Sequence, residues 1–530
     1  MPPPPGEILL RRSGFLGAAI LCLELGSNFT PSPQGILRPA YLGDRQHDPS
    51  TESSTTAMTP STFTSLASAA LVVSICNEAF GVDRLVPADY PTIQSAIDAC
   101  AIGDTVVIAP GVYAESISVS ARSITMRPSS VVGSVAISGI GGRVMEIAAI
   151  PVPGISIKDI EFRGGHGAPF GGAIHASASV VSIEGCRFFD NSITGGDGSY
   201  GGAGLYATGC DVSITGCEFA HCNVSLSTGG YPFGFGGAIL LDGCVAAIEG
   251  CVFHDNNVST TVPSASWAEA RANGGALAAR NSDGVIKYCS FSENSLVSNV
   301  SGFGPIASAF GGAVSIGGTP SGRFVISECG FIRNGISTSS SNSFYLGNGG
   351  AVGGAICFGI DGNKKSVHTV INCTFENNAA SKSPITNGIA IADIATVFDE
   401  GAEVTGCTFR WSEATALVET SNQFGATYVG AIRALLSAES MPFTITDSTF
   451  CGANCPTVGA EILASRISTY ANCCPGDLNS DGTVNGADIY VILGFWGAAN
   501  SFPVADINGD GVVNGADLAT VLSNWGTCPR

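Results

Sequence analysis

Two stretches near the C-terminus have the residue types and the spacing of a metal site. "DLNSDGTVNGADIYVILGFWG" (477–497) and "DINGDGVVNGADLATVLSNWG" (506–526) nearly repeat each other. Each has Asp, Asn and Asp at its positions 1, 3 and 5, Gly at position 6, Asn at position 9 and Asp at position 12. Hard oxygen ligands at this spacing, with a glycine for the sharp turn, suit Ca²⁺. We therefore expect the two stretches to bind two Ca²⁺ ions.

The predicted ligands are the side chains at positions 1, 3, 5, 9 and 12 and the backbone carbonyl at position 7. They are Asp477, Asn479, Asp481, Thr483, Asn485 and Asp488 in the first loop, and Asp506, Asn508, Asp510, Val512, Asn514 and Asp517 in the second. Apolar residues follow each loop at helical spacing, so each loop should lead into a helix.

This pair of loops resembles a type I dockerin, the two-repeat calcium module that docks secreted polysaccharide-degrading enzymes onto cohesins. The resemblance implies a cohesin-like or cell-surface protein as partner. Positions 10 and 11, which carry much of the cohesin recognition in that family, are Gly486-Ala487 and Gly515-Ala516 here and have no hydroxyl. A calcium-stabilised tail that retains the chain at a surface is the alternative. Cys473 or Cys474 before the module and Cys528 after it could join its ends by a disulfide.

Composition predicts a repetitive array before these loops. The 530 residues include 70 glycines, only 12% are charged, and the formal net charge is -20. Such a chain is short of solvated helix faces and rich in tight turns. A phosphate backbone needs a positive stripe, so nucleic acid is not an expected partner, and polyanionic sugars are disfavoured for the same reason.

A repeat runs through the middle of the chain. Cys-x-Phe-x-x-Asn begins at Cys186, Cys251, Cys289, Cys329 and Cys373, with weaker copies at Ile160, Cys217, Cys407 and Ser448. Gly-Gly-Ala lies between successive copies, beginning at Gly171, Gly201, Gly236, Gly274, Gly311 and Gly353. Short alternating strands with glycine turns at this period predict a mainly β fold, a right-handed parallel β-helix in which the Cys, Phe and Asn positions stack as ladders of buried side chains.

The two motifs resemble the repeats of the polymorphic outer-membrane protein family, surface adhesins built on right-handed β-helices, over roughly residues 155–450. Residues 90–119 resemble the opening of pectin-lyase-like β-helix proteins, which implies a capping helix around residues 92–99.

These observations divide the chain into four parts. Residues 1–81 are interpreted as a leader with a signal peptide, because short apolar runs occur at 15–23 and 66–76, and Met58 is favoured as the true start. The alternative is a disordered leader. Residues 82–455 should form the β-helix, 456–474 a linker and 475–530 the dockerin-like module. No later run is apolar enough to cross a bilayer, so we expect a secreted or cell-surface chain with no transmembrane segment in its mature form.

Insertions concentrate between the repeat Asn and the next Gly-Gly. In solenoids the side with insertions is commonly the binding face, and aromatic rings there suit sugar or protein recognition. The predicted substrate-binding residues are Tyr231, Phe233, Trp267, Phe303, Phe344 and Tyr345. The alternative is that these segments fold back as small satellite cores.

One column could carry catalysis. The residue before the repeat Asn is Asp190, His221, Asp255 or Glu293 in successive coils, and carboxylates at coil spacing suit glycosidase chemistry. A solvated ladder of turns explains the same column. The sequence therefore favours a protein that binds a glycan or a surface partner, with an extracellular polysaccharide lyase or glycoside hydrolase as the alternative.

Overall fold

The structure is a computed structural model. It describes residues 81–130, 133–266, 268–303, 306–318, 323–340, 350–359, 366–382, 390–391, 393–397, 401–410, 432–434, 443–451, 463–465, 468–470, 474, 476–479, 483–497, 505, 507 and 512–527. Several predictions fall outside this description: the leader before residue 81, Trp267, Phe344, Tyr345, Asp481, Asp506, Asn508, Asp510, Cys473, Cys528 and the side chain of Phe303.

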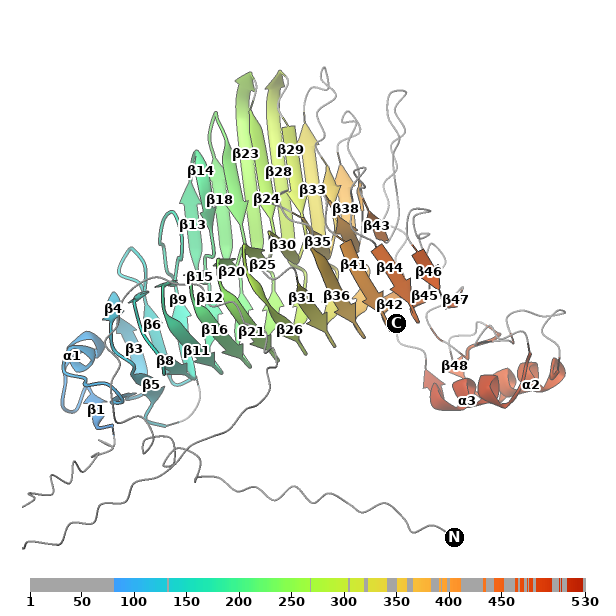
Figure 1. Cartoon of the computed structure of the whole chain (residues 1–530), viewed down its shortest axis with the longest axis horizontal. Helices are drawn as coiled ribbons and strands as arrows, with labels where there is room; N and C mark the ends of the chain where they lie inside the picture. Colours follow the sequence, from blue (N-terminus) through green and yellow to red (C-terminus); the bar gives the residue numbers. More distant parts are fainter. Residues whose placement is uncertain are drawn as a thin grey trace, which may run out of the picture. The chain divides into compact units, whose positions relative to one another are not determined.

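Three parallel sheets form the body of residues 77–530, the second of the two units into which the chain divides (Figure 1). In the described residues sheet A has 13 strands, in the order β1 (Asp83–Val86), β2 (Thr105–Ile108), β5 (Thr125–Pro128), β8 (Ile155–Lys158), β11 (Val180–Glu184), β16 (Asp211–Thr215), β21 (Val245–Glu249), β26 (Asp283–Lys287), β31 (Phe324–Ser327), β36 (Val367–Ile371), β41 (Gly401–Thr405), β44 (Phe443–Thr446) and β46 (Leu463–Ser465).

Sheets B and C complete each coil of the body. Sheet B, of 12 described strands, consists of β3 (Gly111–Ala114), β6 (Val135–Ser138), β9 (Ile160–Arg163), β12 (Arg187–Phe189), β17 (Glu218–Ala220), β22 (Val252–His254), β27 (Ser290–Ser292), β32 (Gly330–Ile332), β37 (Thr374–Glu376), β42 (Thr408–Arg410), β45 (Thr449–Cys451) and β47 (Ser468–Tyr470). Sheet C, of 10 described strands, consists of β4 (Ile117–Ser120), β7 (Met145–Ala148), β10 (Ile174–Ser177), β15 (Leu205–Thr208), β20 (Ile239–Asp242), β25 (Leu277–Arg280), β30 (Val314–Gly317), β35 (Ile356–Phe358), β40 (Ile394–Thr396) and β43 (Ile432–Ala434). The chain visits C, A and B in turn, so each coil covers the edge of the previous one, as predicted.

The helix α1 (Ile93–Asp98) lies in the stretch where the sequence predicts one, between β1 and β2. Thr92 is its N-cap and forms a capping box with Ser95. The helix buries Ile93 and Ile97 in the same core as the strands.

The predicted phenylalanine ladder is the centre of that core. Eight successive ring pairs stack from Phe162 to Phe450, with centroids 4.5 to 5.2 Å apart. This is the spacing of neighbouring strands, so each ring lies on the ring of the coil before it. The repeat of one Phe per coil thus becomes a continuous aromatic column.

Cysteine forms a second ladder at the corner between sheets A and B. A backbone N–H donates to Sγ of the cysteine one coil later, at 3.4 Å, in five members of this ladder: Cys217, Cys251, Cys289, Cys329 and Cys373. Cys407 does the same to the hydroxyl of Ser448. These cysteines of the described part are buried free thiols, so the column stacks without disulfides.

Asparagine forms the third ladder, at the corner after sheet B. Asn256 accepts the N–H of Cys222, and its own amide donates to Phe219 O and Asn294 Oδ1. The side chain therefore satisfies backbone groups that the corner removes from the sheets. Cys222 occupies the Asn position in the weak copy that begins at Cys217.

The corner before sheet C shows why the repeat needs two glycines. It also corrects the predicted position of the copy that begins at Gly201. Gly236 has φ of +54°, and a Cβ on Gly237 would lie 2.1 Å from Gly275 O, so the first glycine makes the turn and the second permits close approach of two coils. In the copy that begins at Gly201, the residue with positive φ is Gly202. That copy is therefore shifted by one residue, and Tyr200 pairs with Gly234.

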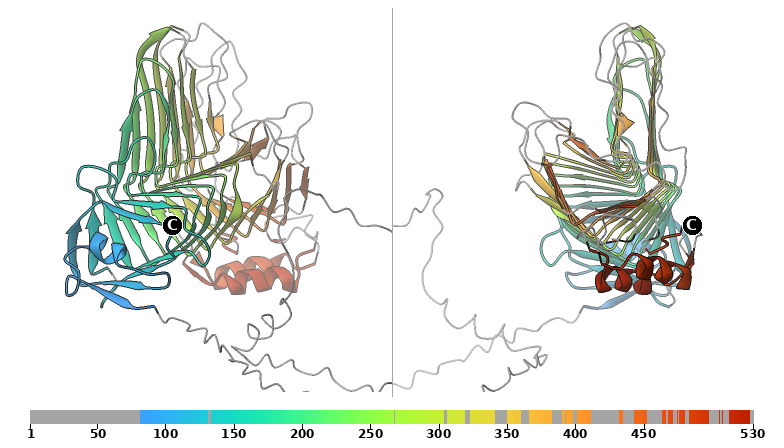
Figure 2. Two further views of the ribbon diagram at one scale, coloured as in Figure 1. Left: turned by 60° about the vertical axis from the view of Figure 1, so that its left-hand side comes forward. Right: turned by 90° about the vertical axis from the view of Figure 1, so that its right-hand side faces the viewer.

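The described residues of the variable segments are mostly in strands. They form two parallel sheets of six described strands each, drawn at the top of Figure 1. Sheet D consists of β13 (Ser192–Gly195), β18 (Asn223–Ser227), β23 (Asn257–Ser266), β28 (Ser295–Phe303), β33 (Gly335–Ser340) and β38 (Ala379–Lys382). Sheet E consists of β14 (Gly198–Gly201), β19 (Pro232–Phe235), β24 (Glu269–Asn273), β29 (Ile306–Phe310), β34 (Ala351–Val352) and β39 (Ala390–Ile391). We call this pair of sheets the fin; the right-hand view of Figure 2 shows it as a narrow two-layered projection.

Small residues make the fin thin. Sheet E turns Ala270 and Ala307 toward sheet D, where they are buried with Val262 and Val300. At Gly234 a Cβ would lie 2.4 Å from a methyl of Val258, so the two sheets are closely packed there. As far as Thr261 in β23 and Asn299 in β28, the outward positions of sheet D, which we call its polar face, are uncharged and all but three are Ser, Thr or Asn: Ser192, Thr194, Asn223, Ser225, Ser227, Asn257, Ser259, Thr261, Ser295, Val297, Asn299, Gly335, Ser337, Ser339, Ala379 and Ser381.

The C-terminal residues form a separate small core. Helices α2 (Gly486–Gly494) and α3 (Gly515–Ser523) contribute Ile492 and Val521, and β48 (Thr483–Val484) pairs antiparallel with β49 (Gly526–Thr527). Both helices lie where the sequence predicts them. In the described part of the chain, none of the helices has the length and apolar character needed to cross a bilayer.

Candidate functional site

The first predicted calcium loop closes around the carboxylate at its position 12. Asp488 is fully buried, and its Oδ1 accepts the backbone N–H of Leu478 at 2.7 Å and of Asn479 at 3.2 Å. Its Oδ2 accepts the N–H of Asn485, the N-cap of α2, at 2.8 Å. One carboxylate thus ties both ends of the loop to the start of the helix.

The second loop repeats this arrangement. Asp517 is fully buried and accepts the N–H of Ile507 at 2.7 Å and of Asn514, the N-cap of α3, at 2.8 Å. The predicted carbonyl ligands, on Thr483 and Val512, each accept the side-chain amide of the Asn two residues later. A carbonyl oxygen has two lone pairs, so this bond alone does not prevent it from binding a metal.

The composition of the module fits a hard cation. Asp477, Asp488 and Asp517 are at most 5% exposed, and residues 474–529 contain no Lys, Arg or His. Buried carboxylates are costly unless a cation compensates them, and oxygen ligands select Ca²⁺ or Mg²⁺. Within the described residues, no three acidic, His or Cys side chains converge on one metal position, and Asp481, Asp506, Asn508 and Asp510 lie outside them. Cys474 is disulfide-bonded.

The four catalytic candidates lie in successive turns at the base of sheet D. Asp190, His221, Asp255 and Glu293 are exposed and have φ between 52° and 56°. This left-handed conformation makes the corner that precedes each Asn of the ladder. Glu293 lies 3.8 Å from the guanidinium of Arg333.

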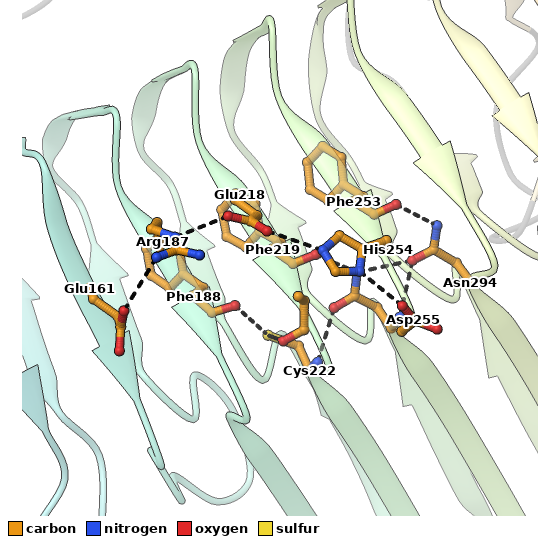
Figure 3. Close-up of polar contacts among 12 residues, drawn as sticks. Glu161, Arg187, Phe188, Glu218, Phe219, Cys222, Phe253, His254, Asp255 and Asn294 are labelled. Carbon is orange, nitrogen blue, oxygen red and sulfur yellow. Dashed lines mark hydrogen bonds and ion pairs between the residues drawn. The ribbon is translucent and has the colours of Figure 1, made fainter. Parts of the chain in front are cut away.

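Asp255 belongs to a chain of charges across the outward side of sheet B (Figure 3). Arg187 lies between Glu161, at 3.7 Å, and Glu218, at 3.0 Å. His254 continues the chain, with Nε2 3.2 Å from Glu218 and Nδ1 2.9 Å from Asp255. The ring of His254 is thus held between two carboxylates, one on each ring nitrogen.

The network shifts two pKa values in opposite directions. Burial alone would lower the pKa of His254, but hydrogen bonds to Asp255 and Glu218 outweigh it and raise that pKa above its usual value. Burial alone would raise the pKa of Glu218, but hydrogen bonds from His254 and Arg187 hold it below its usual value. The fold therefore favours the ion pair of imidazolium and carboxylate.

We expect His254→Gln to destabilise the β-helix only at mildly acidic pH. A raised folded-state pKa adds stability that is full below the unfolded value of about 6.5 and is lost as pH rises through the folded value. Glu218 has a lowered pKa, so its contribution is present above about 4.3 and is lost as pH falls further. Urea unfolding at pH 5.5 and pH 8.5 measures the difference. His221→Gln is the control, because this ring meets His254 edge-on, at 5.9 Å, without adding a carboxylate. An equal loss at both pH values would contradict the expectation.

Four residues of this network were not predicted from the sequence: Glu161, Arg187, Glu218 and His254. Arg187 and Glu218 occupy the same place in their repeats, one residue after Cys, and register pairs them directly. Aligning the weak copy at Cys217 with its neighbours could have shown this pair. His254 reaches Glu218 diagonally across the sheet, which no alignment of equal positions reveals.

The two described aromatic candidates lie on sheet E or next to it and differ from each other. Tyr231 is 52% exposed, and its backbone N–H donates to Asp197 at 2.7 Å. Phe233 is partly buried against a cluster that includes Tyr206 and Phe235, and the guanidinium of Arg271 lies over its ring. Tyr231 is thus about half exposed, whereas Phe233 contributes to a satellite core.

Comparison with known proteins finds two families in the chain. The family described as "Right handed beta helix region" matches residues 155–409, and the "Dockerin type I domain" matches residues 475–524. No curated protein and no solved structure matches the chain. The first match covers the coils that carry the three ladders, and the second covers both loops with buried position-12 carboxylates. Residues 155–409 of this chain are a right-handed β-helix region, and residues 475–524 are a dockerin type I domain.

Proposed function

We propose that this chain is a secreted or cell-surface protein that binds a glycan through its fin and is held in place by its dockerin domain. The observation that carries the proposal is the presence of both domains in one chain, since dockerin domains typically bind cohesins in assemblies that act on polysaccharides. The dockerin would bring the chain to a cohesin-like or cell-surface partner, and calcium would order the two docking helices. An outer face with an exposed tyrosine suits sugar stacking.

We expect Tyr231→Ala to weaken glycan binding without changing stability. An exposed ring that stacks on sugar should cost about 1 kcal/mol or more of affinity when it is removed. The matched variant Phe233→Ala empties a partly buried site and should lower the melting temperature. A screen of the full-length chain against soluble neutral and acidic polysaccharides identifies the ligand, and calorimetry measures both variants. Unchanged affinity in Tyr231→Ala for every ligand found would contradict the proposal.

A second function, an extracellular polysaccharide lyase or glycoside hydrolase, is favoured by the contact of His254 with Asp255 and Glu218. An imidazole between two carboxylates can hold and move a proton. Asp255→Asn separates the two functions, because an enzyme would lose turnover and keep its affinity. A binding protein would show no release of sugar with either form.

A further inference from the structure

The polar face of sheet D is unlike the other outward surfaces of the coils. Sheet B carries Glu161, Arg187 and Glu218 outward, and sheet A carries Glu249 and Lys287. The polar face has no charged and no aromatic residue at any of its described positions, on a chain with a net charge of -20. The column of turn residues Asp190, His221, Asp255 and Glu293 lies along the base of this face and is not part of it.

The pairing of neighbouring strands arranges the side chains of this face in a regular lattice. Asn223, Ser225 and Ser227 pair residue for residue with Asn257, Ser259 and Thr261. Neighbouring strands are ~4.8 Å apart and alternate residues along a strand are ~6.7 Å apart, so hydroxyl and amide groups recur at fixed intervals in two directions. Side chains are also linked across strands: Asn257 donates to Ser295 at 2.9 Å and Ser339 to Asn299 at 2.7 Å.

The thin fin holds this lattice rigid. On the inner side of sheet D, Thr260 donates to Ser298, which donates to the carbonyl of Ala270 in sheet E. Val258, Val262 and Val300 are fully or almost fully buried. A ligand that docks on the outer side therefore meets side chains whose backbone is fixed by two layers, and few groups have to be ordered on binding.

The size of the face argues against a protein partner. Six strands with two or three outward residues on each span at most ~24 Å by ~13 Å, or roughly 300 Å². A stable protein interface needs about 800 Å² on each partner. A ligand that is itself repetitive needs no large single contact, because many weak contacts of one lattice with another add up.

We propose that the polar face of sheet D adsorbs an ordered, uncharged polysaccharide. Sugar hydroxyls both donate and accept hydrogen bonds, as Ser, Thr and Asn do. The absence of charge fits a neutral polymer, and the net charge of the chain repels an acidic one. An ordered solid has already lost the chain entropy that a dissolved polysaccharide would lose at the surface. The glycan class rests on the proposed function, whereas the face differs from the one that carries Tyr231.

Paired lysine substitutions test this inference. Ser225→Lys with Ser259→Lys places two long charged side chains in the lattice, on neighbouring strands. The matched control is Ser213→Lys with Ala247→Lys, an equally spaced exposed pair on sheet A of the same two coils. Surface substitutions of this kind change the free energy of unfolding by no more than about 0.5 kcal/mol. Both pairs should therefore have nearly the melting temperature of the wild type.

Adsorption of the full-length chain, with Ca²⁺ present, is measured by depletion onto microcrystalline cellulose and onto chitin. We expect the wild type to adsorb to at least one of them, the lysine pair in sheet D to lower the partition coefficient about tenfold or more, and the control pair to leave it within about twofold. Ser225→Ala with Ser259→Ala should give a several-fold loss, because it removes hydroxyls and keeps the shape.

Two results would overturn the inference. They are no adsorption of the wild type to either solid, or equal adsorption of the two lysine pairs. Loss of soluble-glycan binding in Tyr231→Ala, with solid adsorption unaffected by the lysine pair in sheet D, would remove this inference and keep the proposed function. If instead the lysine pair in sheet D lowers adsorption to the solids and Tyr231→Ala leaves soluble-glycan binding unchanged, the proposed stacking site is wrong and the inference about the polar face stands.

Discussion

Chelation of Ca²⁺ is expected to unfold the dockerin domain of the full-length chain and to leave the β-helix folded. Six Asp residues stand among the predicted ligands, with no Lys, Arg or His from residue 474 to residue 529. Two of them, Asp488 and Asp517, are fully buried. Without a cation, the buried and clustered carboxylates repel each other in a small core.

The size of the effect follows from mass action. A Ca²⁺ concentration of 100 times the dissociation constant stabilises by about 2.7 kcal/mol per site, so two sites give roughly 5 kcal/mol. A domain of this length is stable by only ~3 to 8 kcal/mol in total. Scanning calorimetry should therefore show a low-temperature transition that disappears with chelator, and titration calorimetry should count two ions.

Two variants sharpen this prediction. Asp488→Ala should remove the first site together with the N3 half of the capping box of α2, while Asn500→Ala, outside both loops in the sequence, serves as the control. A transition that chelator does not move, or a single ion per chain in the wild type, would refute the expectation of two calcium sites.

Truncation in the middle of the phenylalanine ladder is expected to be the most destabilising single change in the β-helix. Phe253 is fully buried, with ring centroids 5.0 Å from Phe219 and 4.7 Å from Phe291. Removing a buried Phe side chain costs ~3 to 5 kcal/mol, and each lost ring pair is worth a further ~0.5 to 1.5 kcal/mol. Urea unfolding of Phe253→Ala should show this loss in the β-helix transition.

The ladder supplies its own control. Phe450→Ala lies at the end of the described stack and gives up one ring contact, with Phe409, where Phe253→Ala gives up two. Phe253→Leu keeps most of the volume and should cost much less than Phe253→Ala. Losses of the same size at Phe253 and Phe450 would show that stacking contributes nothing beyond burial.

Much of the β-helix could be predicted because its repeat places the same residue type at the same corner of every coil. Cys217, Phe219 and Asn256 follow the motif, and the structure stacks them as predicted. The shift at Gly202 could not be predicted, since "GGAG" allows the turn at either of its first two glycines. Only pairing with Gly236 in the next coil selects one.

The variable segments were harder to predict, because their lengths differ from one coil to the next. Asn257–Ser266 alternates buried Val258 and Val262 with outward Ser259 and Thr261, which is a strand pattern, but its partner strand is 38 residues away. The network of His254 with Glu218 and Asp255 was missed for the same reason. Contacts between coils depend on register, and register depends on insertions whose lengths differ from one coil to the next.

The cysteine ladder has a consequence for how the chain is made. Unfolded, a chain with this many thiols could be cross-linked wrongly at many places, and export would take it into an oxidising compartment. Sheet-rich domains fold in about milliseconds to seconds, whereas disulfides form in seconds to hours. We therefore expect the coils to close before their thiols are oxidised. Once stacked, the thiols are protected by burial, because each cysteine of the ladder is at most 3% exposed. Ordered stacking thus acts as a kinetic safeguard, and slow-folding variants should be recovered as mixed disulfides.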